Sequence, residues 1–359
     1  MVKHLYLHVP FCKSICAYCD FCHWPYQITK VDEWLDELAL EMNSYQINEE
    51  LKTIYIGGGT PTSLNLQQLE RLLSLIKPYS LNVEEYTIEV NPETIDEMKV
   101  DLLKKYGINR ISMGLQAVQD DLLKMMNRHH NLNDVKKAID IFHRKGIHNI
   151  SLDLMYSLPH QSIDNFKESL EVACSLDVNH LSLYSLVVED NTLFAKKGYQ
   201  SLEDDIEADM YELAVSYLSS QGFEQYEISN FAKDKHYSSH NLAYWSYNDF
   251  YGISLGASGK IGDCRYDNTR NLKDYLNHQY RQNEIYLSLE DMMFEEIMMS
   301  FRTIFGLDLK RFEKRYKRSF FEVCKKPYEQ HREDFIFSDN TLRVKNLELL
   351  NSLLVDFMD

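Results

Sequence analysis

The first half of the chain alternates short apolar segments with longer amphipathic ones, and this alternation limits the fold more than any other feature. The apolar segments have the length of strands, and the amphipathic ones carry apolar residues at the spacing of a helix. The expected strands span residues 4–9, 53–56, 86–90, 110–113, 150–154 and 180–187. Strand–helix–strand units connect through right-handed crossovers, which curl a parallel sheet in one direction. We therefore predict an α/β fold with a partial (β/α)6 barrel.

The segment 133–145 shows the helical pattern plainly. Asn133 can cap its start, and Gly146 suits the left-handed position that follows a helix C-terminus. Its apolar stripe consists of Val135, Ala138, Ile139 and Phe142. We expect this stripe to face the sheet.

Four cysteines are crowded into the loop after the first expected strand: Cys12, Cys16, Cys19 and Cys22. Such a loop can converge on a metal centre of either of two kinds. Three thiolates can hold three irons of a cubane iron–sulfur cluster and leave the fourth iron open to a substrate, whereas a structural zinc ion would take all four thiolates. Zinc knuckles usually have two Cys-x-x-Cys pairs separated by a longer stretch, so the spacing favours the cluster.

The overall composition is that of a cytoplasmic protein that does not bind nucleic acid. The chain has 38 basic and 55 acidic side chains, and its net charge of −17 opposes contact with a phosphate backbone. The three other cysteines stand alone, without a disulfide-like pattern. No apolar run is long enough to span a membrane, and the first residues lack the pattern of a signal peptide. We expect no integral membrane segment.

Chemically distinctive residues gather where the expected strands end. Glycines 57–59 follow the second strand, Glu89 lies at the end of the third, Gln116 follows the fourth and Asp153 closes the fifth. Each could be a turn or surface residue by itself. Because ligands of parallel α/β sheets bind at the carboxyl ends of the strands, their shared position predicts one ligand site.

The pattern changes twice along the chain, which suggests three regions. Residues 1–190 hold the barrel with its ligand site, and 191–285 form a connecting region. That region begins with a helix over 204–220, whose inward face we expect to be Ile206, Met210, Leu213 and Tyr217. Residues 286–359 are predicted to form a small, helix-rich C-terminal domain.

The cysteine loop, Cys-x-x-x-Cys-x-Tyr-Cys, resembles the signature of radical S-adenosylmethionine (SAM) proteins. Further motifs occur in the order found in the branch of that family that contains anaerobic coproporphyrinogen III oxidase and the related haem chaperones (HemW type). They are Tyr6-x-His8-x-Pro10-Phe11-Cys12, Gly57-Gly58-Gly59-Thr60-Pro61, Glu89-x-Asn91-Pro92, Gly114-x-Gln116, Asn127-Arg128 and Asp153-Leu154-x-x-x-Leu158-Pro159. The resemblance covers nearly the whole chain. It implies a partial barrel of the radical-SAM type.

The resemblance also implies roles for individual residues. Cys12, Cys16 and Cys19 match the ligands of a 4Fe-4S cluster whose fourth iron binds SAM. The positions that match SAM contacts are Tyr6, Tyr18, Gly58, Gly59, Thr60, Glu89, Gln116, Arg128 and Asp153. Their chemistry is suitable, since glycines let a backbone approach closely and a carboxylate can bind a ribose diol. Cys22 is outside the three-cysteine pattern, and we expect it to be a spare thiol.

The segment His240-Asn241-x-x-Tyr244-Trp245 looks like a motif of the haem-chaperone branch. Histidine is a common haem ligand, so His240 is the natural ligand candidate, with the rings of Tyr244 and Trp245 as flat surfaces against a porphyrin. A purely structural histidine is the alternative. Ser258 stands where many relatives carry another histidine.

Two functions fit this resemblance. In the first, the protein is a haem chaperone that binds haem and delivers it to client haem proteins. In the second, it is an oxygen-independent coproporphyrinogen III oxidase-like enzyme that cleaves SAM and acts on porphyrin propionates. The oxidase carries a long segment before its cysteine loop, and here eleven residues precede Cys12. That difference and the His240 motif favour the chaperone. Both functions imply a small electron donor such as flavodoxin or ferredoxin.

Overall fold

One curved sheet organises the molecule, and its central strands follow the order of the sequence. The computed structural model describes residues 1–47 and 50–357. Six strands run parallel in the order β1-β4-β5-β6-β7-β8. They are β1 (His4–Val9), β4 (Thr53–Gly58), β5 (Glu85–Val90), β6 (Arg110–Gln116), β7 (Asn149–Tyr156) and β8 (His180–Ser185). All six were expected, and within the described residues the sheet does not close, so the prediction of a partial barrel is confirmed.

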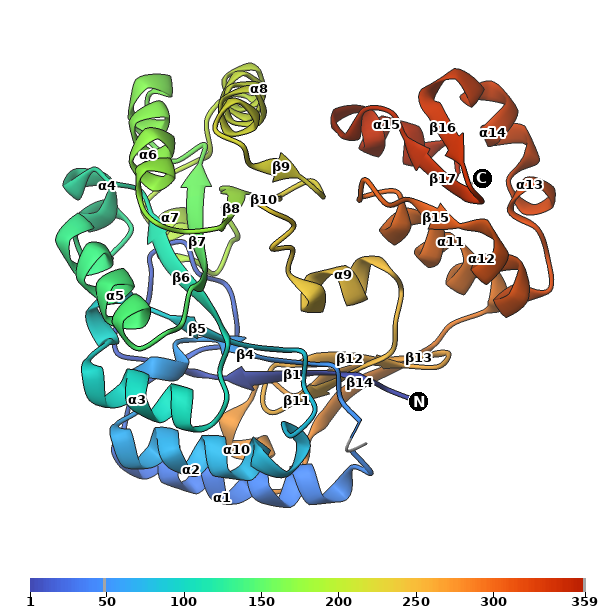
Figure 1. Cartoon of the computed structure of the whole chain (residues 1–359). Helices are drawn as coiled ribbons and strands as arrows, with labels where there is room; N and C mark the ends of the chain where they lie inside the picture. The colour runs from blue at the N-terminus through green and yellow to red at the C-terminus, as the bar shows by residue number, and fades with distance from the viewer. Residues whose placement is uncertain (48–49, 358–359) are drawn as a thin grey trace.

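Helices cover the outer side of these strands (Figure 1). They are α1 (Ile28–Ser44), α2 (Leu66–Ile76), α3 (Glu97–Lys105), α4 (Asp120–Met125), α5 (Leu132–Arg144) and α6 (Ile163–Ser175). The stripe expected on α5 is buried, and Gly146 has the left-handed φ of 79°. The helix is capped by Asn131 and not by the expected Asn133. The side-chain oxygen of Asn131 accepts hydrogen bonds from the N–H groups of Asn133 and Asp134.

The connecting region adds strands to both ends of the sheet, which the sequence did not reveal. After α7 (Leu193–Lys196) and α8 (Asp204–Ser220), β9 (Glu224–Gln225) and β10 (Asn230–Ala232) extend the β8 end. Strand β11 (Phe250–Ile253) pairs in parallel with β1, followed outward by β12 (Ser258–Ile261), β13 (Cys264–Asn268) and β14 (Arg281–Tyr286). Two short helices complete the region: α9 (Ser239–Trp245) and α10 (Leu272–Tyr275). The sheet therefore contains strands from both sides of residue 190, where the first two expected regions meet.

Helix α8 has the expected bounds, and it packs against α6. Most of its expected inward face is confirmed, because Met210 is buried and Ile206 and Tyr217 pack, partly buried, against the core. Ala214 and Leu218 are buried as well and continue the stripe that starts at Met210. The correction concerns Leu213, which was expected on this face and is only partly buried.

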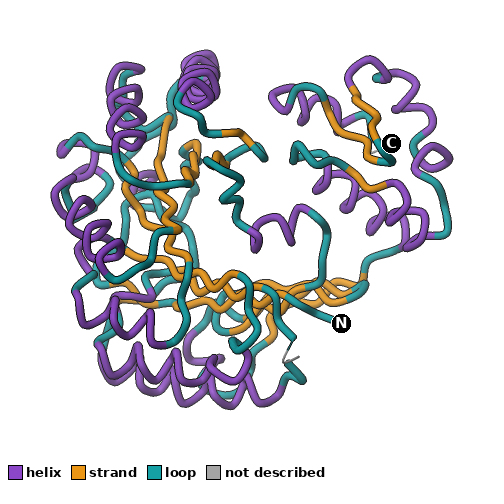
Figure 2. Tube along the Cα trace, viewed as in Figure 1, coloured by secondary structure: helices purple, strands orange, loops and turns teal. Residues whose placement is uncertain are grey.

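The C-terminal residues form a second apolar core of their own, built from residues between Met293 and Phe357. Figure 2 shows strands running from the barrel below α9 toward this part of the molecule. Its elements are α11 (Leu289–Ser300), β15 (Leu307–Asp308), α12 (Leu309–Tyr316), α13 (Phe320–Val323), α14 (Lys325–Gln330), β16 (Phe335–Ser338), β17 (Thr341–Val344) and α15 (Leu350–Val355). The N–H of Ile304 donates to the carbonyl of Tyr226 at 3.0 Å and ties this part to the connecting region. None of the described helices is long and apolar enough to cross a membrane.

Candidate functional site

The cysteine loop lies at the carboxyl end of β1. Strand β2 (Phe11–Cys12) pairs with β3 (Trp24–Pro25) and closes the loop at its base. The far side of the loop is fixed to the end of α4, because Ala17 N–H donates to Met126 O at 2.9 Å and Asn127 Nδ2 donates to Ile15 O at 2.7 Å. The three predicted cluster cysteines, Cys12, Cys16 and Cys19, line one cavity of about 450 Å³.

Cys22 faces away from this cavity. Its buried side chain lies against Gly256, where an added Cβ would overlap it, and its Sγ lies 3.7 Å from the carbonyl oxygen of Arg270. Its own carbonyl oxygen accepts a hydrogen bond from His8 Nε2 at 2.8 Å. The loop therefore directs three cysteines into the cavity and packs the fourth into the protein.

This arrangement fits a three-cysteine cluster better than a zinc ion. A structural zinc ion would take all four thiolates of the loop. Cys12, Cys16 and Cys19 line the cavity, whereas Cys22 packs against Gly256. A cubane cluster can be held by three thiolates, each on an iron of its own. Cys12, Cys16 and Cys19 are the residues that would hold it.

Two neighbours would support the cluster ligands. Arg128 Nη1 lies 3.5 Å from Cys16 Sγ and places a positive charge beside a thiol that becomes an anion when it binds iron. Thr60 Oγ1 lies 3.7 Å from Cys12 Sγ. Burial raises the pKa of Cys12 to about 11, so this thiol is protonated at neutral pH until a metal takes the place of the proton.

The glycines at the end of β4 bring the backbone close to the cysteines. A Cβ on Gly59 would lie 3.0 Å from Cys12 Sγ and 2.7 Å from Val9 O, so a side chain there would displace the loop. Gly58 has a φ of 107°, which other residues rarely adopt, and its N–H donates to Glu89 Oε2 at 3.0 Å. Tyr55 OH donates to the other oxygen of Glu89 at 2.8 Å. Burial raises the pKa of Glu89 to about 7.

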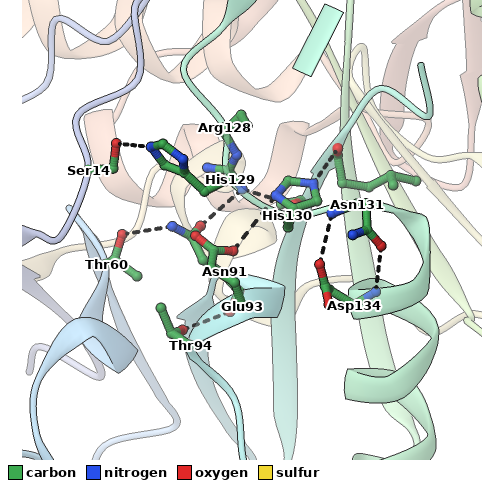
Figure 3. A network of polar contacts seen from close by, with 12 residues as sticks. Ser14, Thr60, Asn91, Glu93, Thr94, Arg128, His129, His130, Asn131 and Asp134 are labelled. Carbon is green, nitrogen blue, oxygen red and sulfur yellow. Dashed lines mark hydrogen bonds and ion pairs between the residues drawn. The ribbon is translucent and has the colours of Figure 1, made fainter. Parts of the chain in front are cut away.

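Arg128 is the centre of a polar network beside the cavity (Figure 3). Its Nη2 donates to Asn91 Oδ1 at 3.1 Å and to Gly114 O at 3.0 Å, and Asn91 Nδ2 donates to Thr60 Oγ1 at 3.2 Å. Among the described residues, the Nε of Arg128 has no hydrogen-bond partner, and this atom is buried out of reach of the cavity. Arg128 nevertheless lines the cavity, where the charge of its guanidinium suits a carboxylate ligand.

The residues that follow Arg128 hold its segment in place. His129 Nε2 lies 2.9 Å from Ser14 Oγ of the cysteine loop. His130 Nε2 lies 3.1 Å from Leu115 O. Burial lowers the pKa of His130 to about 4, so the ring is neutral at physiological pH and its contact with Glu93 is not an ion pair. Figure 3 shows these contacts on both sides of Arg128. The guanidinium is therefore fixed before any ligand binds.

Asp153 and Gln116 complete the wall at the ends of β6 and β7. Ser112 Oγ donates to Asp153 Oδ2 at 3.0 Å, and burial raises the pKa of Asp153 to about 6. Gln116 has a φ of 66°, and the pairing of β6 with β7 shifts register between Gly114 and Gln116. Left-handed backbone at residues other than glycine is concentrated at functional sites, and here the shift turns Gln116 toward the cavity.

All the predicted SAM-contacting residues line the 450 Å³ cavity except Tyr6. Tyr18 borders it and packs on Phe194 with ring centroids 6.3 Å apart. The hydroxyl of Tyr6 instead lies 2.9 Å from His8 Nδ1, in a neighbouring hollow. The structure thus brings together the cysteines and the rest of the set, and it leaves Tyr6 outside this cavity.

The cavity wall contains further residues that were not predicted as site residues: Tyr55, Asn91, Ser112 and Tyr184. Three of them could have been found. Ser112 lies two residues before Gly114 on β6, so both face the same side of the sheet. In the same way, Tyr55 lies two residues before Gly57 on β4 and faces the same side as that glycine. Asn91 follows the end of β5 directly.

The haem-motif residues lie on α9, and only some of them are accessible. His240 is 1% exposed, with Nδ1 2.7 Å from Thr53 Oγ1 and Nε2 2.7 Å from Tyr244 OH. Burial lowers the pKa of His240 to about 3. In contrast, Asn241, Tyr244 and Trp245 line a second cavity of about 800 Å³, which lies between α9, the β12–β13 strands and α11. Tyr184 borders both cavities.

Comparisons with known proteins agree with this architecture. The Radical SAM superfamily matches residues 6–173, and the HemN C-terminal domain matches residues 287–345. The solved structure of coproporphyrinogen III oxidase (HemN) from Escherichia coli superposes with a TM-score of 0.85 at 22% identity, over 99% of this chain and 90% of that one. The fold and the three-cysteine loop define a protein of the radical-SAM class, which implies a 4Fe-4S cluster and SAM.

Curated relatives narrow this class to one family. "Heme chaperone HemW" of Bacillus subtilis is 40% identical over 89% of this chain and 88% of that protein. "Heme chaperone HemW" of Lactococcus lactis is 38% identical over 88% and 85%, and that of Escherichia coli is 33% identical over 84% and 82%. The chain belongs to the HemW family.

Proposed function

We propose that this protein is a cytoplasmic haem chaperone, which binds haem and delivers it to client haem proteins. The main support for this proposal is the similarity to relatives named for that function, which are 33–40% identical over 84–89% of the chain. The second cavity supports the proposal. Its volume of about 800 Å³ is in the range of cofactor-sized pockets, and it has an aromatic wall suited to a porphyrin face.

The first cavity would hold the cluster on Cys12, Cys16 and Cys19 with SAM beside it. Bound together, these groups supply reductive cleavage of the SAM sulfonium. Arg128 lines this cavity and can bind the SAM carboxylate, and the carboxyl of Glu89 accepts the Gly58 N–H and shapes the glycine turn. Asp153, held by Ser112, is placed for a ribose hydroxyl. A small electron donor such as flavodoxin or ferredoxin would reduce the cluster.

Tyr184 gives the two cavities a shared wall. Haem in the second cavity would therefore lie next to the SAM site without entering it. Occupancy of one cavity can affect the other through this side chain, so we propose that SAM and the cluster regulate haem binding or release.

The second candidate is a coproporphyrinogen oxidase-like enzyme, favoured by the superposition on that fold. Several propionates would call for several free cationic side chains. Lys260 and Arg265 line the second cavity, and each has an ion pair, with Asp249 at 3.1 Å and Glu295 at 2.7 Å. Arg265 keeps N–H donors beyond its ion pair, but two partly engaged cations suit a ligand with few carboxylates, which agrees with haem.

Anaerobically purified protein with a reconstituted cluster separates the two candidates. Haem titration followed by absorbance, and conversion of coproporphyrinogen III with SAM and a reductant, are measured on the same sample. We expect stoichiometric haem binding and no decarboxylation. Robust decarboxylation would refute the chaperone function, and a sample without saturable haem binding would refute it as well.

A further inference from the structure

His240 is held inside the protein by bonds to both of its ring nitrogens. To reach a haem iron, it would have to give up Thr53 on one side and Tyr244 on the other. Its ring also packs on Tyr55, with centroids 5.2 Å apart. Because the hydrogen bond fixes the Tyr244 phenol, which does line the 800 Å³ cavity, the geometry makes His240 a positioning residue for the cavity wall.

Two methionines of α11, Met298 and Met299, line the same cavity. A methionine thioether is one of the axial ligands that proteins use for haem iron. Met298 also packs against the apolar core of the C-terminal domain. Arg302 lies in the turn after α11, and its guanidinium carbon is 5.9 Å from the ring centroid of Trp245. This contact places the end of α11 next to α9, and Met299, in the last turn of α11, lines the cavity there.

The remaining walls suit the other parts of a haem. Tyr244, Trp245 and Phe250 supply ring surfaces, and the rings of Tyr244 and Phe250 already meet edge to face at 4.5 Å. Arg265 lines the opposite wall. Its guanidinium has five N–H donors, more than its ion pair with Glu295 uses, so it can also bind a propionate.

We propose that the cargo haem lies in the cavity between α9, β12–β13 and α11, with the thioether of Met299 as an axial ligand of the iron and a propionate on Arg265. This inference rests on the proposed haem-binding function and adds its site and its ligand. It places the cargo across the junction between the barrel and the C-terminal domain. Movement of α11 away from α9 would remove the sulfur ligand and open the site.

The first test is loss of the ligand. Hemin is added to full-length, cluster-loaded protein carrying Met299→Leu, and the sulfur-to-iron charge-transfer band of the ferric protein is recorded. We expect the band in the wild type and its loss in the variant, with haem affinity about tenfold weaker. The control is Met292→Leu, the same change on the same helix outside this cavity, which should keep the band. Far-ultraviolet circular dichroism checks that all variants are folded.

The second test is gain of a ligand. Ser258 lines the cavity, and Ser258→His would place an imidazole in it. If haem lies there, the variant acquires a nitrogen ligand and its Soret spectrum moves toward the low-spin form; an unchanged spectrum would overturn the location. A band that survives in Met299→Leu, or one that is lost only in Met298→Leu, would overturn the assignment of Met299. Wild-type protein that binds no hemin would instead refute the proposed function.

Discussion

The Nε2 of His8 lies 2.8 Å from the backbone carbonyl oxygen of Cys22, and this bond orients the end of the cysteine loop. A carbonyl can only accept, so Nε2 carries the proton and Nδ1 accepts from Tyr6 OH at 2.9 Å. Burial lowers the pKa of His8 to about 4, which keeps the ring neutral at physiological pH. Tyr6 and His8 therefore act on the cluster site through the position of the loop.

This orientation predicts opposite results for two serine variants. Cys16→Ser removes a thiol that lines the cluster cavity, so we expect loss of the cluster after anaerobic reconstitution. Cys22→Ser changes a side chain that packs on Gly256, so we expect it to keep the cluster. Iron and sulfide content and the visible absorbance measure both. Equal loss of iron in the two variants would make Cys22 a ligand.

Glu89→Gln is expected to weaken SAM binding about tenfold. A glutamine has one carbonyl oxygen in place of the two carboxylate oxygens that accept from Tyr55 and Gly58, so one of these two donors, Tyr55 OH or Gly58 N–H, loses its acceptor. Equilibrium dialysis of SAM against cluster-loaded protein gives the affinity. The matched control is Glu84→Gln, an exposed acid whose ion pair with Lys52 contributes little. Equal affinities in both variants would remove Glu89 from the SAM site.

The alternation of apolar and amphipathic segments was sufficient to predict the central strands, because each strand–helix unit is local in sequence. Strand β11 could not be found in this way, because it is only four residues long and pairs with β1 between residues as distant in sequence as His4 and Phe250. Its neighbours contain glycines that look like a loop. In the folded protein, a side chain at Gly252 would overlap the backbone of Ser258, so the glycine serves close packing of strands.

The cavity at the strand ends was largely predictable for a similar reason. Strand ends of a parallel sheet meet at one edge, so Glu89, Gln116 and Asp153 could be grouped without a structure. Orientation within the loops could not be predicted, since it depends on contacts with distant residues. The bond from His8 holds the backbone of Cys22, whose side chain packs against Gly256, and the bonds to Thr53 and Tyr244 hold His240 inside the protein.

His240→Ala is expected to weaken haem binding severalfold without changing the axial ligand. The change leaves a void behind Tyr244 and removes a buried partner of Thr53, which should lower the free energy of unfolding by about 2 kcal/mol. Urea denaturation measures the second effect, and haem titration with ferric spectra measures the first. The control is His236→Ala, an exposed histidine. If the spectrum of His240→Ala shows a different ligand set, His240 is itself the ligand.

The buried carboxyl of Glu41 predicts how stability depends on pH. Glu41 joins α1 to the outer strands, accepting hydrogen bonds from Ser254 N at 2.9 Å, Asn268 Nδ2 at 3.2 Å and Tyr275 OH at 2.6 Å. Burial raises its pKa from 4.5 to about 7. The folded state therefore holds this proton more tightly than the unfolded state does, and stability is lost as pH rises from about 4.5 through 7.

A comparison of Glu41→Gln with the wild type isolates this contribution. The glutamine does not ionise, so the variant does not lose this stability as the pH rises. The difference in free energy of unfolding, variant minus wild type, should therefore increase by about 1 kcal/mol from pH 6 to pH 8. Denaturant unfolding of both proteins at the two pH values gives the difference. Glu33→Gln, a change at an exposed acid on the same helix, should show no such shift. A constant difference between Glu41→Gln and wild type would mean that Glu41 keeps an ordinary pKa in the folded protein.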